Sequence, residues 1–165
     1  METIIREDTP KTPYVKFDGE QGVIEIKGRS IPENSVEFYK PLIDWIDEYA
    51  GKPNDTTVIN IQLEYFNTSS SKCILDIFKK VELLFKKGYE VQVNWYYEED
   101  DEDMFEAGED YQSIINLPFK MIEMEEWNEH DNDCLKRTYI SFCMRVPSDL
   151  NKWILYGWNM NEHHL

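Results

Sequence analysis

Four consecutive hydroxyl side chains stand where a strand-like run gives way to a helix-like one. They lie in the segment Asn67-Thr68-Ser69-Ser70-Ser71-Lys72. A helix N-terminus presents unpaired backbone N–H groups and roughly half a positive charge, which together stabilise a phosphate placed there. Thr68 to Ser71 are therefore candidate phosphorylation sites. Asn, Ser and Thr also cap helices by accepting hydrogen bonds from those N–H groups, so simple capping is the alternative.

A second candidate site is an acidic run, in which nine of the thirteen residues from 98 to 110 are Asp or Glu. Met104, Phe105 and Tyr111 recur at a spacing that predicts a strongly acidic helix, and such a run is usually a solvated face. A carboxylate-rich site for a divalent metal is the alternative. Because the run lacks the spacing of a calcium-binding loop, we expect no metal there.

The sequence lacks the residues and motifs that several other kinds of chemistry require. All three histidines, His130, His163 and His164, lie beyond residue 126, so the preceding domain has no imidazole for acid–base catalysis or metal binding. The two glycine-rich loops that hold nucleotide phosphates are both missing from the sequence. We therefore predict no catalytic residue and no cofactor, and a protein that is not an enzyme.

Hydrophobic periodicity predicts the elements that position these residues. The predicted order is strands at 13–17 and 22–27, a helix capped by Asn34 or Ser35, a strand at 57–65, a helix at about 69–87, a strand at 91–97, the acidic helix, and a strand at 119–125. Pro41 leaves two alternatives for the first helix, a start near Lys40 or a kink at the proline. This order predicts an α/β fold, a mixed sheet of about five strands with helices mainly on one face. The polar opposite face is available to a partner.

Composition and charge restrict the classes of partner that the chain is expected to bind. Seventeen basic and 33 acidic residues give a net charge of −16, which disfavours nucleic acids and anionic membranes. No signal pattern or membrane span is evident, so we expect a cytoplasmic protein. Residues 127–165 carry four basic and five acidic residues, which leaves −15 on residues 1–126. This shift predicts a domain at 8–126 and an extension of unknown role at 127–165.

Four segments of the chain occur together in this order: Ile31-Pro32-Glu33-Asn34-Ser35, Ile43-Asp44-Trp45-Ile46, the run from Leu63 to Asp76, and Val93-Asn94-Trp95-Tyr96-Tyr97. On these segments the chain shows a resemblance to the SiaC family of bacterial regulatory phosphoproteins. The resemblance covers roughly residues 8–126, a single-domain length. It implies a fold similar to the STAS domains of anti-sigma-factor antagonists.

The resemblance also implies a function. In this family a partner kinase phosphorylates a threonine and a phosphatase restores it. The unmodified protein binds and activates a diguanylate cyclase, which makes cyclic di-GMP and promotes biofilm formation. Carried onto this sequence, the modified residue is Thr68, with Asn67, Ser69, Ser70 and Lys72 as the surrounding switch region. Lys72, one turn into the helix, is placed to pair with the phosphate.

Three hypotheses therefore follow from the sequence. The first is a non-enzymatic signalling switch, in which phosphorylation of Thr68 controls binding to a partner protein. The second is a metal-dependent enzyme that uses the acidic cluster 98–110. The third is a constitutive protein-interaction module, in which the hydroxyl cluster serves only as a helix cap.

Overall fold

The computed structural model describes residues 2–124. Within this range the chain forms six strands and three helices. They are β1 (Ile4–Arg6), β2 (Tyr14–Asp18), β3 (Val23–Ser30), α1 (Ser35–Tyr49), β4 (Thr56–Phe66), α2 (Thr68–Lys86), β5 (Glu90–Glu98), α3 (Glu102–Ile114) and β6 (Phe119–Met124).

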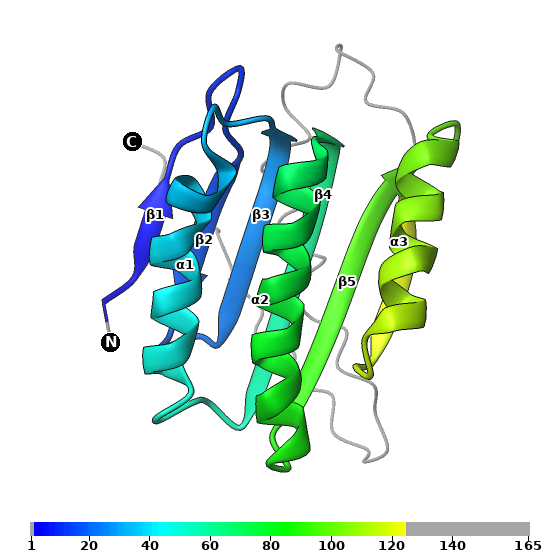
Figure 1. Cartoon of the computed structure of the whole chain (residues 1–165). Coiled ribbons are helices and arrows are strands. Elements are labelled where there is room, and N and C mark those ends of the chain that lie inside the picture. Colours follow the sequence, from blue (N-terminus) through cyan, green and yellow to red (C-terminus); the bar gives the residue numbers. More distant parts are fainter. Residues whose placement is uncertain (1, 125–165) are drawn as a thin grey trace, which may run out of the picture. The chain divides into compact units, whose positions relative to one another are not determined.

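The strands form one mixed sheet in chain order, β1-β2-β3-β4-β5-β6. β1, β2 and β3 are antiparallel neighbours, whereas β3, β4, β5 and β6 run parallel. A helix connects each parallel pair, and right-handed crossovers place all three helices on one face, as Figure 1 shows. Each of these helices therefore begins at the end of the sheet where the parallel strands finish, which we call the carboxyl edge.

The core lies between the sheet and the helices. Alternate residues of β4 and β5 point into it, and Ile59, Ile61, Val93 and Trp95 are completely buried. Apolar stripes at helical spacing close it from the other side, and their buried members are Tyr39, Leu42, Trp45, Ile46 and Tyr49 of α1 and Cys73, Ile74, Ile77, Phe78, Val81 and Leu84 of α2. Full burial of one such side chain contributes about 1.5–3 kcal/mol, so these stripes fix how α1 and α2 lie on the sheet.

The acidic helix α3 approaches the sheet closely through its glycine. A Cβ atom on Gly108 would lie 2.5 Å from Cε of Met121 and 2.7 Å from Cδ1 of Trp95. The indole N–H of Trp95 also donates a hydrogen bond to the backbone oxygen of Met104 at 3.0 Å. The helix is therefore held by its small and apolar residues, which leaves its acidic residues facing outward.

The predicted mixed α/β sheet with helices on one face is confirmed. The sheet has six strands rather than about five, because Ile4–Arg6 pairs with β2 as an edge strand too short to show alternation in the sequence. α1 begins at Ser35 with Pro41 in its interior, so the predicted alternative of a start near Lys40 is wrong. The predicted division into 8–126 and 127–165 stays a prediction, because residues 125–165 lie outside the described range.

The face of the sheet without helices carries polar side chains. Strand register places Lys16, Glu25, Asn60, Asn94 and Lys120 in one row across five strands. Within the row, the Asn94 amide donates to Oδ1 of Asn60 at 2.9 Å. Contact of this face with a partner stays a prediction.

Candidate functional site

Thr68 is the first residue of α2, at the carboxyl edge of the sheet. Asn67 caps the helix, because its Oδ1 accepts the Ser70 N–H at 2.8 Å. The Ser71 N–H bonds to the Asn67 carbonyl oxygen at 2.9 Å and starts the helical ladder. In the range 2–124, no acceptor takes up the N–H groups of Thr68 and Ser69. N–H groups at a helix start point along the axis toward its N-terminal end, where they attract anions.

The four consecutive hydroxyl residues have different surroundings. Thr68 and Ser69 are exposed, whereas Ser70 is completely buried. Ser71 is half-buried, and its hydroxyl lies 2.9 Å from the phenol oxygen of Tyr111, which also donates to the Ser71 carbonyl oxygen at 3.0 Å. Burial raises the pKa of Tyr111 to about 12, so its phenol is a neutral donor. Thr68 and Ser69 are therefore the two hydroxyls of this run that a kinase can reach.

Buried hydroxyl groups connect the start of α2 to α1 and β3. The hydroxyl of Ser70 lies 2.9 Å from that of Ser30 and 3.2 Å from that of Ser35. Ser30 also lies 2.7 Å from the phenol oxygen of Tyr39, and Ser35 donates to Oδ1 of Asn67 at 3.4 Å. The N–H of Asn67 donates to the Ser30 carbonyl oxygen at 3.1 Å. The cap of α2 is thus fixed to both neighbouring elements.

Charge at the three helix starts is distributed unevenly. α1 has Glu37 in its first turn, and α3 has Glu102 and Asp103, so each carries negative charge at its positive end. The first turn of α2 has no acidic side chain, although α2, with 19 residues, is the longest of the three described helices. The positive end of α2 is therefore not balanced by a charge from its own first turn.

Two charged residues, Glu64 and Lys72, lie four positions to either side of Thr68 in the sequence. Lys72 is exposed and lies one turn after Thr68 on the same helix face, and no acidic group of residues 2–124 lies within ion-pairing distance of it. Glu64, at the end of β4, pairs with Nε of Arg29 at 3.6 Å. This exposed ion pair offsets part of the charge of Glu64.

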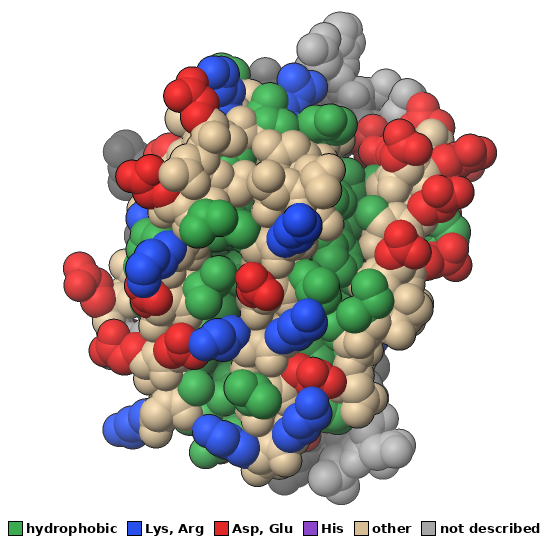
Figure 2. Space-filling view, viewed as in Figure 1, with side chains coloured by type: hydrophobic (Ala, Val, Ile, Leu, Met, Phe, Trp, Pro, Cys, Tyr) green, Lys and Arg blue, Asp and Glu red, His purple; other side chains and the backbone are tan. Residues whose placement is uncertain are grey.

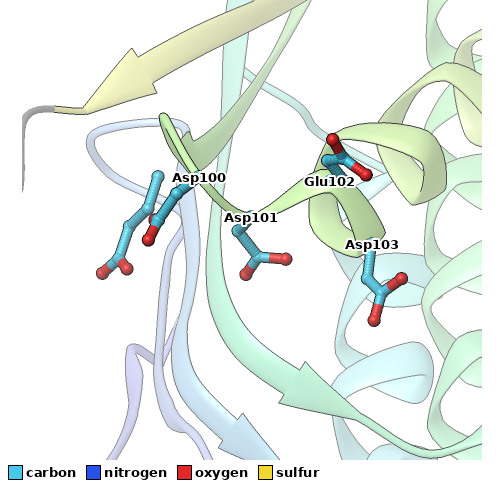
Figure 3. Close-up of a pocket in the computed structure, with 5 residues that line it drawn as sticks. Asp100, Asp101, Glu102 and Asp103 are labelled. Atoms are coloured by element: carbon cyan, nitrogen blue, oxygen red, sulfur yellow. The ribbon is translucent and has the colours of Figure 1, made fainter.

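The acidic run forms an exposed patch along α3 and the turn before it. Figure 2 shows acidic side chains gathered over α3. An open hollow of about 420 Å³ is lined by Glu98, Asp100, Asp101, Glu102 and Asp103. Figure 3 shows Glu102 directed to the opposite side from Asp101 and Asp103. In the described range, no three His, Cys, Asp or Glu side chains converge to hold a metal ion, so the metal-enzyme hypothesis has no ligand cluster there.

Asp101 has a structural task within this run. Its Oδ1 accepts the Met104 N–H at 2.9 Å and caps α3. The acidic helix predicted from the sequence is thus present, with one of its carboxylates serving as the cap.

Comparison with known proteins decides the family. Residues 6–124 match the family described as SiaC family regulatory phosphoprotein. The chain belongs to the SiaC family. Over 118 residues it is 30% identical to an uncharacterised protein of Pseudomonas aeruginosa, a match that covers 72% of this chain and 94% of that protein. The resemblance inferred from the sequence is therefore confirmed.

Solved structures of SiaC from P. aeruginosa have the same fold. One structure of SiaC is 27% identical, with a TM-score of 0.69 and coverage of 75% of this chain and 100% of that one. A second structure shows the diguanylate cyclase SiaD in complex with its activator, SiaC. The SiaC chain of that complex is 28% identical to this chain, with a TM-score of 0.70 and coverage of 73% of this chain and 99% of that one. In that complex SiaC of P. aeruginosa is the activator of the cyclase.

The structure brings together part of the predicted switch region of this SiaC family member. Asn67 caps α2, Thr68, Ser69 and Lys72 lie on its exposed first turns, and Ser70 points into the core. Sequence reasoning missed the partners of Ser70, because Ser30 and Ser35 precede it by 40 and 35 residues. No local pattern identifies contacts at that separation.

Among the described residues, no helix is long and apolar enough to span a membrane.

Proposed function

We propose that this chain is a regulatory protein that binds and activates a diguanylate cyclase, and that reversible phosphorylation of Thr68 controls this binding. The observation that carries the proposal is the exposed hydroxyl of Thr68 at the start of α2 in a member of the SiaC family. The described complex of SiaC with SiaD supports a cyclase as the partner. The unmodified protein is the active form, and a kinase and a phosphatase set its amount.

The surroundings of Thr68 favour a phosphate that leaves the fold intact. Phosphorylation adds about −1.5 to −2 charges and three acceptor oxygens. The free N–H groups of Thr68 and Ser69 offer donors, and Lys72 offers a nearby positive charge. The modification therefore changes the surface that a partner meets rather than the packing beneath it.

Exposed apolar side chains beside Thr68 support a protein-binding surface. Val36, in the first turn of α1, is 69% exposed, and Tyr65, at the end of β4, is 56% exposed. Ser35, the residue before Val36, hydrogen-bonds to Asn67, so both apolar residues lie close in the fold to the start of α2. A doubly charged phosphate near such residues would have to lose hydration when a partner covers this surface, which opposes binding.

Catalysis belongs to the partner in this proposal. The chain contributes a surface and a switch residue, and the cyclase carries out the chemistry on GTP. Because GTP is a cytoplasmic substrate, we place the action of this protein in the cytoplasm.

The experiment uses the cyclase of the same organism, with cyclic di-GMP formation and binding affinity as readouts. We expect Thr68→Glu to weaken binding by about tenfold or more and to abolish activation, because a desolvated charge opposes the contact. Thr68→Ala should bind as the unmodified protein does. Gln112→Glu, which adds the same charge at an exposed position near the far end of α3, is the matched control and should bind normally.

The constitutive interaction module gives the opposite result. If Thr68→Glu and Gln112→Glu bind the cyclase equally well, charge at Thr68 does not control binding and the proposal is wrong. Circular dichroism must show both variants folded, so that loss of binding is not loss of structure.

A further inference from the structure

The buried hydroxyl groups near Thr68 form a hydrogen-bond chain with one direction. Each hydroxyl has a single proton to donate. Ser30 donates its proton to Ser70, so the phenol of Tyr39 must donate to Ser30. Ser35 donates to Asn67, so Ser70 must donate to Ser35. The chain therefore runs from Tyr39 through Ser30, Ser70 and Ser35, and ends on the side chain of Asn67.

The identity of the last acceptor in this hydrogen-bond chain also follows from chemistry. The Ser70 N–H can only donate, so the side-chain atom of Asn67 that it meets at 2.8 Å must be the amide oxygen. That oxygen is the same atom that receives the proton of Ser35. The last hydrogen bond of the chain and the helix cap thus share one acceptor, immediately before Thr68.

Burial makes these hydrogen bonds necessary to each other. Tyr39, Ser30 and Ser70 have no exposed surface, and Ser35 is 4% exposed. Water therefore cannot replace a missing partner without rearrangement, and a chain of aligned hydroxyls is stronger than its separate bonds. Loss of a hydroxyl in the middle weakens the cap at the end.

The phase of the helix connects this chain to the exposure of Thr68. Successive residues of an α-helix are rotated by about 100°, so a residue two positions away points to nearly the opposite side. Ser70, held inward by Ser30 and Ser35, keeps Thr68 directed outward.

We propose that Ser70 is a positioning residue, whose buried hydroxyl fixes the first turn of α2 so that Thr68 is presented to its kinase and its partner. Ser70 is not itself a phosphate acceptor, because its hydroxyl is buried and engaged with Ser30 and Ser35. The part of this inference that concerns kinase and partner rests on the proposed function, whereas the local positioning does not.

Amide hydrogen exchange of the full-length protein tests the positioning directly. The reporters are the N–H groups of Ser70 and Ser71, which both bond to Asn67. In Ser70→Ala we expect them to exchange about tenfold faster than in the control Ser69→Ala, while amides in the middle of α2 keep their rates. Equal rates in the two variants would overturn the inference, since Ser70 would then be an ordinary buried residue.

Tyr39→Phe provides a second, milder perturbation. It removes the first donor of the chain and preserves the ring, so the variant is expected to fold even if Ser70→Ala does not. We expect faster exchange of the same two reporter amides, by a smaller factor than in Ser70→Ala. In the double variant the two effects should combine to less than their product, because both act through one chain. Independent effects that multiply would overturn the chain.

Mass spectrometry of protein from its native cells supplies the biological readout. We expect the phosphorylated fraction at Thr68 to fall at least about threefold in Ser70→Ala relative to Ser113→Ala, an exposed serine near the far end of α3, at equal amounts of folded protein. An unchanged fraction would overturn the role of Ser70 in presentation. Absence of phosphate at Thr68 in the unaltered protein would refute the proposed function instead, and hydrogen exchange would still decide the local positioning.

Discussion

The asparagine caps of α1 and α2 differ in their buried hydrogen bonds, and this difference predicts how much stability each cap contributes. Asn34 caps α1 at the surface, where its Oδ1 accepts the Glu37 N–H at 3.2 Å. Asn67 caps α2 in the same way, but its Oδ1 accepts a second hydrogen bond from the buried hydroxyl of Ser35. Substitution by alanine therefore removes one bond accepted by the side-chain oxygen in α1 and two in α2. In α1 it also removes the exposed bond from Nδ2 of Asn34 to Oε2 of Glu37 at 3.2 Å, which water can replace.

The expected losses of stability follow from these bonds. Loss of an exposed asparagine cap costs about 1 kcal/mol, which we expect for Asn34→Ala. Asn67→Ala adds the cost of leaving the Ser35 hydroxyl without its acceptor, about 1–2 kcal/mol, for a total of about 2–3 kcal/mol. For a chain of this size, the loss expected for Asn67→Ala lowers the Tm by roughly 5–10 °C.

Urea denaturation followed by circular dichroism measures both values. Asn67→Asp is the matched control, because its carboxylate keeps the acceptor oxygen and suits the positive helix end, so we expect stability within about 0.5 kcal/mol of the unaltered chain. Equal destabilisation by Asn34→Ala and Asn67→Ala would refute the reasoning, since the buried hydroxyl would then contribute nothing to the cap.

Two further substitutions test the packing of α3. Gly108→Ala should destabilise the fold by about 1–3 kcal/mol in urea denaturation, because the new methyl group meets Met121 and the buried Trp95; a neutral effect would show that α3 can move away from the sheet. Tyr111→Phe tests the pH dependence. Since burial raises the pKa of Tyr111 to about 12, from about 10 when unfolded, its contribution is complete below pH 10 and is lost as the pH rises toward 12. Between pH 10 and 12 the unaltered chain should therefore lose up to about 2–3 kcal/mol more unfolding free energy than the variant. The same dependence of unfolding free energy on pH in both proteins would contradict the raised pKa of Tyr111.

Periodicity predicted the elements well wherever a segment was long and buried on one face. The alternation of Ile59, Ile61 and Leu63 identified β4, and the stripe through Ile74 and Phe78 identified α2. Both patterns arise because one side of each element packs against the core and the other side faces water. β1 was missed because three residues at a sheet edge bury too little to require a pattern.

The candidate site was less predictable than the fold. The hydroxyl run and its place at a helix start follow from the sequence, since Asn, Thr and Ser favour such starts. Which hydroxyls are exposed depends on the rotation of α2 about its axis, and the burial of Ser70 depends on Ser30 and Ser35 in other elements. Such contacts depend on the tertiary arrangement, so they required the structure.

Electrostatic magnitudes indicate where the proposed phosphorylation of Thr68 would take effect. A negative group at a helix N-terminus is stabilised by about 0.3–1 kcal/mol, and the first turn of α2 has no acidic side chain to compete for this effect. The opposing acidic residues of α3 are exposed, and salt screens exposed charges over about 8 Å under physiological conditions. The local gain therefore offsets the screened repulsion, and the phosphorylated domain should be about as stable as the unmodified one. A switch that leaves the stability of the fold unchanged has to act through the free energy of binding to the partner.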